Sequence, residues 1–479
     1  MDTRVKLEEV KKFLNNYSEH IITSLLLIPI SILFILHEFS DDAKTYQGVA
    51  RLTDYFGKFP TNIDLAYETK PIANRMLNYF LYKIGSLFTT FGTPEYEILI
   101  KSISLLCVLV ICYYFSTKIN KKYIFLLSTL AFLTPLNFTL LVPDWWSPLF
   151  SLLALSLFLT DKPLNHYLSG IIITIICLLK GPTILLVIPI ACMIYFLRRD
   201  IWLQILKRGA ISSSISLIII LLCGYFKNII PDMLILSKYG HLGYDSFSTM
   251  VMNFVNILLP TLFFIPILIS GFVATLLLYY QFIKNRELNK LCILICMWIP
   301  IFIYIFIQNE FFPYHYMSLV LPAILSIILL SNISIKRSII IIIIIFIAMS
   351  YLGSIMNVEG GVANRSVANN IITNFPDIQY QNHILYLDSG SAPYYFQSNT
   401  SCRFIQSLPF KTNSPTWNIT DTPQYQENFK CIIDYNDKYI IIDELWFNQN
   451  TPDNAQVINK IQTNYKLVYN DGWRVYERK

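Results

Sequence analysis

Residues 98–117 read ILIKSISLLCVLVICYYFST, a stretch of about twenty residues with a single charged side chain. A helix of that length is about 30 Å long, which is the thickness of the hydrocarbon core of a bilayer. The stretch therefore predicts a transmembrane helix. Ten further apolar stretches predict spans at 21–37, 123–141, 146–160, 166–179, 181–197, 210–226, 254–282, 291–307, 317–332 and 338–357.

The composition of the whole chain agrees with this pattern. Of 479 residues, 54% are hydrophobic and only 14% are charged, and the mean hydropathy is +0.49. A soluble chain carries about 25% charged residues. We therefore expect an α-helical polytopic membrane protein with about eleven spans, surrounded by membrane lipids and without a nucleic-acid partner.

Lysine and arginine alternate between the short loops, and this alternation predicts the orientation. The basic loops contain Lys118, Lys121, Lys122, Lys162, Arg198, Arg199, Lys207, Arg208, Lys284, Arg286, Lys290, Lys336 and Arg337. Cytoplasmic loops carry such an excess. The N-terminal segment 1–20, predicted to be a surface helix, is also basic. We expect it to lie in the cytoplasm, with the C-terminal region outside the plasma membrane. The first apolar run lacks a cleavage site and is predicted to be a retained anchor.

The predicted transmembrane domain covers residues 21–357 and includes a long outer loop, 38–97. Within the loop, apolar residues at helical spacing predict a juxtamembrane helix lying in the interface with its apolar face towards lipid. These residues are Ile72, Met76, Leu77, Phe80, Leu81, Ile84, Leu87 and Phe88.

From residue 358 the long apolar runs end and turn residues appear, which predicts an extracytoplasmic α/β domain over 358–479. Its compartment permits a disulfide between Cys402 and Cys431, and the sequence leaves that pairing open. We expect strands at 383–388, 431–434, 439–443 and 465–469, and helices near 363–374 and 453–464.

Acidic residues follow the first span, where a carboxylate can act as a base. Asp42 and Tyr46 are four residues apart and share one helix face. Adjacent helical residues point about 100° apart, so only one of Asp41 and Asp42 is expected to face a shared cavity. Partial desolvation at the bilayer surface raises the pKa of a carboxylate and makes it a better base.

A basic motif precedes the predicted juxtamembrane helix. Residues 68–71 read Glu68-Thr69-Lys70-Pro71, and the proline pre-sets the backbone at a helix start. The Lys70 ammonium suits a phosphate oxygen, and Glu68 lies beside it. The alternative is a lysine that extends towards lipid headgroups.

Four polar residues lie at the predicted outer ends of spans: Asp144, Lys180, Glu310 and His315. They are candidates for the lining of one outer cavity that binds substrate, and the alternative for each is an interface anchor or a helix cap. No Cys/His spacing is typical of a zinc site. We expect no required cofactor and leave a divalent metal open.

Taken in order, several motifs resemble the GT-C membrane glycosyltransferases. The branch most similar contains aminoarabinose lipid A transferases and protein O-mannosyltransferases. The matching pieces are D-x-x-x-Y-x-x-x-A from Asp42, ETKPIANRMLNY (68–79), VPDWWSPLFSLLALSLFL (142–159), LLKGPTILLVIP (178–189) and FPYHYMSLVLPAIL (312–325).

The resemblance implies transfer of a sugar from a polyprenyl-phosphate donor to a lipid, glycan or protein acceptor at the outer face. It implies Asp42 as the catalytic base and Lys70 as the residue that holds the phosphate, with inversion at the anomeric carbon. The chain departs from the family pattern at Ala43 and Thr45, where a glutamate and an arginine often stand. Asp41 therefore remains an alternative base.

Two other classes are considered. A transporter or flippase would place polar residues at the middle of the membrane and show inverted repeats, whereas this chain places its polar residues at outer ends. A related GT-C polymerase or ligase with a pyrophosphate-linked donor would carry more arginine in its outer loops.

Overall fold

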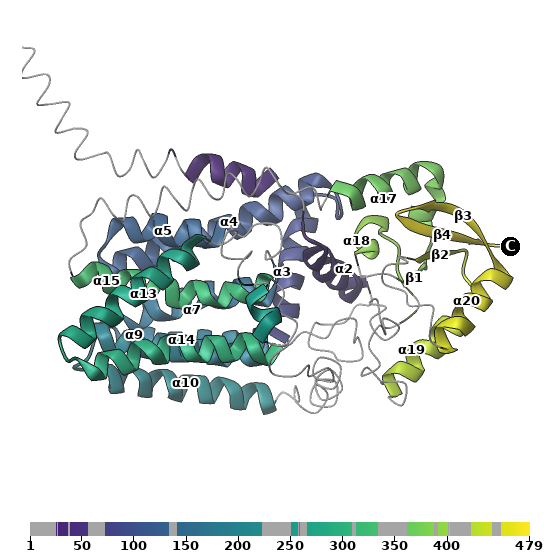
Figure 1. Cartoon of the computed structure of the whole chain (residues 1–479). Coiled ribbons are helices and arrows are strands. Elements are labelled where there is room, and N and C mark those ends of the chain that lie inside the picture. Colours follow the sequence, from purple (N-terminus) through teal and green to yellow (C-terminus); the bar gives the residue numbers. More distant parts are fainter. Residues whose placement is uncertain are drawn as a thin grey trace, which may run out of the picture.

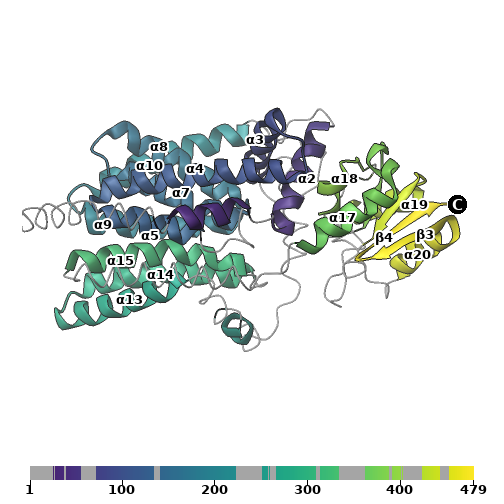
Figure 2. The same ribbon diagram turned by 90° about the horizontal axis from the view of Figure 1, so that it is seen from above.

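The computed structural model has two parts, a bundle of membrane helices and a C-terminal α/β unit, with two helices between them (Figures 1 and 2). The residues described are 25, 27–36, 39–55, 72–133, 141–222, 251–256, 258, 266–308, 313–333, 362–387, 391–400, 402, 423–442 and 452–479.

The bundle follows the predicted apolar stretches. Among the described residues, four helices are long and apolar enough to cross a membrane: Pro94–Ile119, Trp202–Leu222, Ile267–Lys284 and Leu288–Phe306. The chain is a membrane protein. The bundle elements are α4 (Pro94–Ile119), α5 (Lys122–Leu133), α7 (Pro143–Phe158), α8 (Pro163–Leu179), η1 (Gly181–Leu186), α9 (Val187–Leu197), α10 (Trp202–Leu222), α13 (Pro266–Lys284), α14 (Leu288–Gln308), η2 (Pro313–Leu319) and α15 (Val320–Ile333).

The count of about eleven spans stays a prediction. A shorter helix, Leu27–Leu36, lies within the first predicted span. The segment 338–357 lies outside the described residues, as does the predicted surface helix at 1–20.

Small residues let the bundle helices approach closely, as is usual between membrane helices. A Cβ on Gly170 of α8 would lie 2.1 Å from the carbonyl oxygen of Gly209 on α10. A Cβ on Gly271 of α13 would lie 2.3 Å from the Cβ of Ala323 on α15. These two helix pairs therefore pack at distances that only glycine allows.

Helices α2 (Asp41–Tyr55) and α3 (Ile72–Phe88) lie between the bundle and the C-terminal unit in both views (Figures 1 and 2). The helix predicted from the apolar spacing is α3, and its place at the membrane surface stays a prediction. Its residues Phe80, Ile84, Leu87 and Phe88 share one exposed face. The opposite face buries Asn78 against α2, where its amide oxygen accepts a hydrogen bond from Gln47 at 2.9 Å.

The C-terminal unit contains a four-stranded sheet in the order β1-β2-β4-β3. β1 pairs with β2 in parallel, and the other two pairings are antiparallel. Gly472 turns the β3–β4 hairpin with a φ of +75°, a conformation that favours glycine. The elements are α17 (Val362–Asn374), η3 (Pro376–Tyr380), β1 (Leu385–Leu387), α18 (Ala392–Phe396), α19 (Pro423–Asp434), β2 (Tyr439–Ile442), α20 (Pro452–Asn464), β3 (Tyr465–Asp471) and β4 (Trp473–Arg478).

One predicted strand is wrong. Residues 431–434 form the last turn of α19, where Ile432 is buried in the small core and Phe429 packs against the same core. The run of apolar residues is too short to distinguish a strand from a buried helix turn. The predicted strands at 383–388, 439–443 and 465–469 are confirmed in their central residues, and β4 was not predicted.

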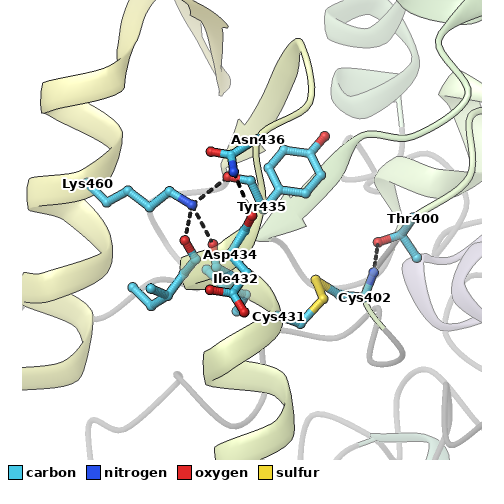
Figure 3. Close-up of a disulfide and its surroundings, with 9 residues drawn as sticks. Thr400, Cys402, Cys431, Ile432, Asp434, Tyr435, Asn436 and Lys460 are labelled. Carbon is cyan, nitrogen blue, oxygen red and sulfur yellow. Dashed lines mark hydrogen bonds between the residues drawn. A yellow bond between two sulfur atoms is a disulfide. The ribbon is translucent and has the colours of Figure 1, made fainter.

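A disulfide and a lysine hold the end of α19 in place (Figure 3). Cys431 is bonded to Cys402, with a Cα–Cα distance of 5.7 Å. From α20, the Lys460 ammonium donates to the carbonyl oxygens of Ile433 and, at 2.5 Å, Tyr435. These carbonyls lie where a helix end leaves acceptors unsatisfied. Burial lowers the pKa of Lys460.

The double substitution Cys402→Ser/Cys431→Ser is expected to destabilise the C-terminal unit. The bond closes a loop with a sequence separation of 29, and its loss should lower the free energy of unfolding by about 3–4 kcal/mol because the unfolded chain gains entropy. Thermal unfolding of the unit, followed by hydrogen exchange at β1 and β2, measures the effect. The control is Cys292→Ser, at a free and exposed thiol. An unchanged unfolding temperature in the double variant contradicts a stabilising role.

Candidate active site

The proposed base lies in the first turn of α2. Ser40 caps this helix, since its hydroxyl accepts from the Ala43 amide at 3.3 Å and its carbonyl from the Lys44 amide at 3.0 Å. Asp42 is half-buried, whereas Tyr46, one turn further on, is buried. The amide groups of a helix N-terminus favour negative charge in this position.

Several predicted site residues fall outside the described part. Glu68, Lys70 and Glu310 are among them, and so is the side chain of Asp41. Their roles stay predictions. In the described part of the chain, no group of three or more His, Cys, Asp or Glu side chains converges in a way that could hold a metal ion.

Two predicted residues, Asp144 and Lys180, form a buried ion pair. The Lys180 Nζ lies 3.0 Å from Oδ2 and 3.3 Å from Oδ1 of Asp144. Asp144 lies in the first turn of α7, and Lys180 stands between α8 and η1. The Asp144 side chain is 1% exposed and that of Lys180 is 14% exposed. The carboxylate is thus enclosed by protein while the cation retains some access.

Tyr304 of α14 completes this cluster and was not predicted. Its hydroxyl donates a hydrogen bond to Oδ1 of Asp144. His315 is buried in η2, an element that packs against both α7 and α14. Asp144, Lys180 and His315 therefore belong to parts of the bundle that contact one another. Of the three, Asp144 and Lys180 touch directly.

A second buried carboxylate, Glu97 in the first turn of α4, joins three parts of the chain. Its Oε2 accepts from the backbone amide of Phe39 at 3.0 Å, and its Oε1 accepts from the Tyr394 hydroxyl at 3.1 Å. The same Oε1 forms an ion pair with Arg365 of α17. Burial and the Glu97 charge raise the pKa of Tyr394 well above its usual value, so its hydroxyl stays protonated and donates.

Arg51 ties the other half of α2 to the C-terminal unit. Its guanidinium donates to the carbonyl oxygens of Gln397 and Ser398, directly after α18. The Gln397 side chain donates in turn to the Phe91 carbonyl at 2.8 Å. Burial lowers the pKa of Arg51, yet an arginine remains charged at any physiological pH. The helix that carries Asp42 is thus docked on α18.

The contacts of Glu97 were not predicted from the sequence, although a charged residue close to it indicated a buried polar cluster. Lys101 lies inside an apolar stretch, and a charge at membrane depth usually faces protein. In the structure it is buried, with its Nζ 5.4 Å from the ring centroid of Phe39. Glu97 precedes it by one helix turn on the same face.

Solved structures supply the comparison that decides the fold. ArnT from Cupriavidus metallidurans, in the apo state, matches 96% of this chain and 98% of its own, with a TM-score of 0.59 and 13% identity. The chain has the fold of ArnT. The GT-C resemblance is therefore confirmed at the level of the fold.

A second solved structure is more distant. The oligosaccharyltransferase of Archaeoglobus fulgidus, in complex with zinc and sulfate, matches 96% of this chain and 72% of its own at 13% identity and a TM-score of 0.46. No protein-family model and no curated protein sequence matches the chain.

Removal of one partner of the buried ion pair is expected to destabilise the bundle. Asp144→Asn leaves the Lys180 ammonium without its carboxylate and should lower the free energy of unfolding by about 3 kcal/mol. Thermal unfolding in detergent micelles measures this. The double substitution Asp144→Asn/Lys180→Met should cost less than the sum of the two single ones.

The control is Asp161→Asn. Asp161 pairs with Arg198 at 2.8 Å, but its side chain is 92% exposed, and such a pair contributes less than about 1 kcal/mol. Equal effects of Asp144→Asn and Asp161→Asn would show that the buried pair has no special role.

Proposed function

We propose that this protein is a membrane glycosyltransferase that takes a sugar from a polyprenyl-phosphate donor and transfers it to a lipid, glycan or protein acceptor. The observation that carries the proposal is the fold of ArnT, an aminoarabinose lipid A transferase, over nearly the full length of both chains. Asp42 stands in the first turn of a helix docked between bundle and C-terminal unit, at the place the family motif assigns to the base.

In the proposed reaction, a hydroxyl or amine of the acceptor attacks the anomeric carbon while its proton passes to the Asp42 carboxylate. The bond from the anomeric carbon to the phosphate oxygen breaks, and the polyprenyl phosphate leaves with the electron pair. A single displacement of this kind inverts the anomeric centre.

Cationic side chains would stabilise the leaving phosphate. Lys70 has this role by the family motif, and Lys180 is the described residue that fits it. Asp144 binds the Lys180 ammonium at 3.0 Å, and the Lys180 side chain is 14% exposed. His315, on the neighbouring η2, is a further candidate for this contact.

The proposed orientation places the active site and the C-terminal unit outside the cell and the N-terminus in the cytoplasm. Glu97 contacts the C-terminal unit from the start of α4. Lys118 and Lys121 lie at the other end of this helix, which is long enough to cross the bilayer. An excess of cations at that end supports a cytoplasmic position for it.

Substitution of the base is expected to abolish sugar transfer. Asp42→Asn removes the proton acceptor and should reduce turnover by at least about 100-fold, measured as lipid-linked sugar transfer on membranes. Lys70→Ala should also reduce turnover. Asp41→Asn tests the alternative base, because loss in that variant alone would move the role by one residue.

Asp54→Asn is the matched control on the same helix. Asp54 pairs with Lys83 at 2.6 Å on the partly exposed surface, so this variant should retain turnover. Full turnover in both Asp42→Asn and Asp41→Asn would exclude a base in this turn. Lipid translocation without any sugar transfer by the native protein would favour a flippase instead.

A further inference from the structure

The entry into α2 is held by a residue of another helix. Phe39, two residues before α2, donates its backbone amide to Glu97 of α4, so a carboxylate fixes the chain just before the turn that carries Asp42. The Phe39 ring is also enclosed. Its ring centroid lies 6.1 Å from the centroid of the Tyr394 ring. The same centroid lies 5.4 Å from the Nζ of Lys101.

Glu97 is in turn held by the C-terminal unit. Tyr394 of α18 and Arg365 of α17 both contact its Oε1, and the Glu97 residue is only 3% exposed. A carboxylate buried to this extent requires charge-assisted hydrogen bonds. Arg365 also donates to the Gly92 carbonyl at 3.2 Å, which fixes the guanidinium in the loop before α4.

The connection therefore runs from the C-terminal unit through one carboxylate to the start of the Asp42 helix. We propose that Glu97 is a positioning residue for Asp42, and that the C-terminal unit completes the active site by holding Glu97 through Arg365 and Tyr394. The inference rests on the proposed function, since it takes Asp42 as the base. It gives the C-terminal unit a role in turnover that the sequence did not indicate.

The test compares Glu97→Gln with Glu95→Gln, an exposed acidic residue in the same helix turn. Glutamine keeps the shape of the side chain but loses the charge, and its NH2 group cannot accept a hydrogen bond, so either the Phe39 amide or the Arg365 and Tyr394 donors lose their acceptor. We expect kcat for sugar transfer to fall about tenfold with KM within about twofold, because a displaced base affects the transition state more than donor binding. Glu95→Gln should match the native protein.

Two further measurements separate positioning from general loss of structure. Hydrogen exchange at residues 39–46 should become faster in Glu97→Gln, whereas exchange in α10, which lies away from Glu97, should keep its native rate. In Arg365→Gln the same peptide should also exchange faster. The double variant Glu97→Gln/Arg365→Gln should be no slower in turnover than the worse single one, because both act through one contact.

An unchanged kcat in Glu97→Gln, or unchanged exchange at 39–46, overturns the inference. An equal loss of kcat in Glu95→Gln overturns it as well. Absence of sugar transfer by the native protein would instead defeat the proposed function, and the exchange experiment would still decide whether Glu97 fixes the entry into α2.

Discussion

The Glu97 carboxylate is buried where the membrane bundle, the Asp42 helix and the C-terminal unit meet, and the arrangement of these parts depends on its partners. A buried charge of this kind is costly unless every acceptor is used. One oxygen holds the amide of Phe39, and the other holds Arg365 and Tyr394. The requirement to satisfy one carboxylate thus links segments from three regions of the chain.

The Asp144–Lys180 pair follows the same rule within the bundle. Both residues stand at helix ends, and each neutralises the other. Tyr304 uses a remaining acceptor of the carboxylate. Such pairing allows charged groups near the membrane at low cost.

The sequence predicted those features that leave a local periodic pattern. The apolar residues of α3 repeat every three or four residues, so the helix was predicted, and Phe80, Ile84 and Leu87 lie on its exposed face. Leu81, which was predicted on the same face, is buried in the core instead. Residues 431–434 were too few to show any period, and the strand predicted there is a helix turn. Glu97 and Arg365 are separated by 268 residues, so their pairing leaves no pattern in the local sequence. Only the folded structure shows it.

The most direct measurement is a cryo-electron microscopy map of the protein with a non-reactive polyprenyl-phosphate sugar analogue. The account predicts that the anomeric carbon faces the Asp42 carboxylate, that the phosphate contacts Lys70 or Lys180, and that the C-terminal unit covers the site through α18. An analogue bound with its sugar remote from α2, or a C-terminal unit detached from α2 while the analogue is bound, would contradict the account.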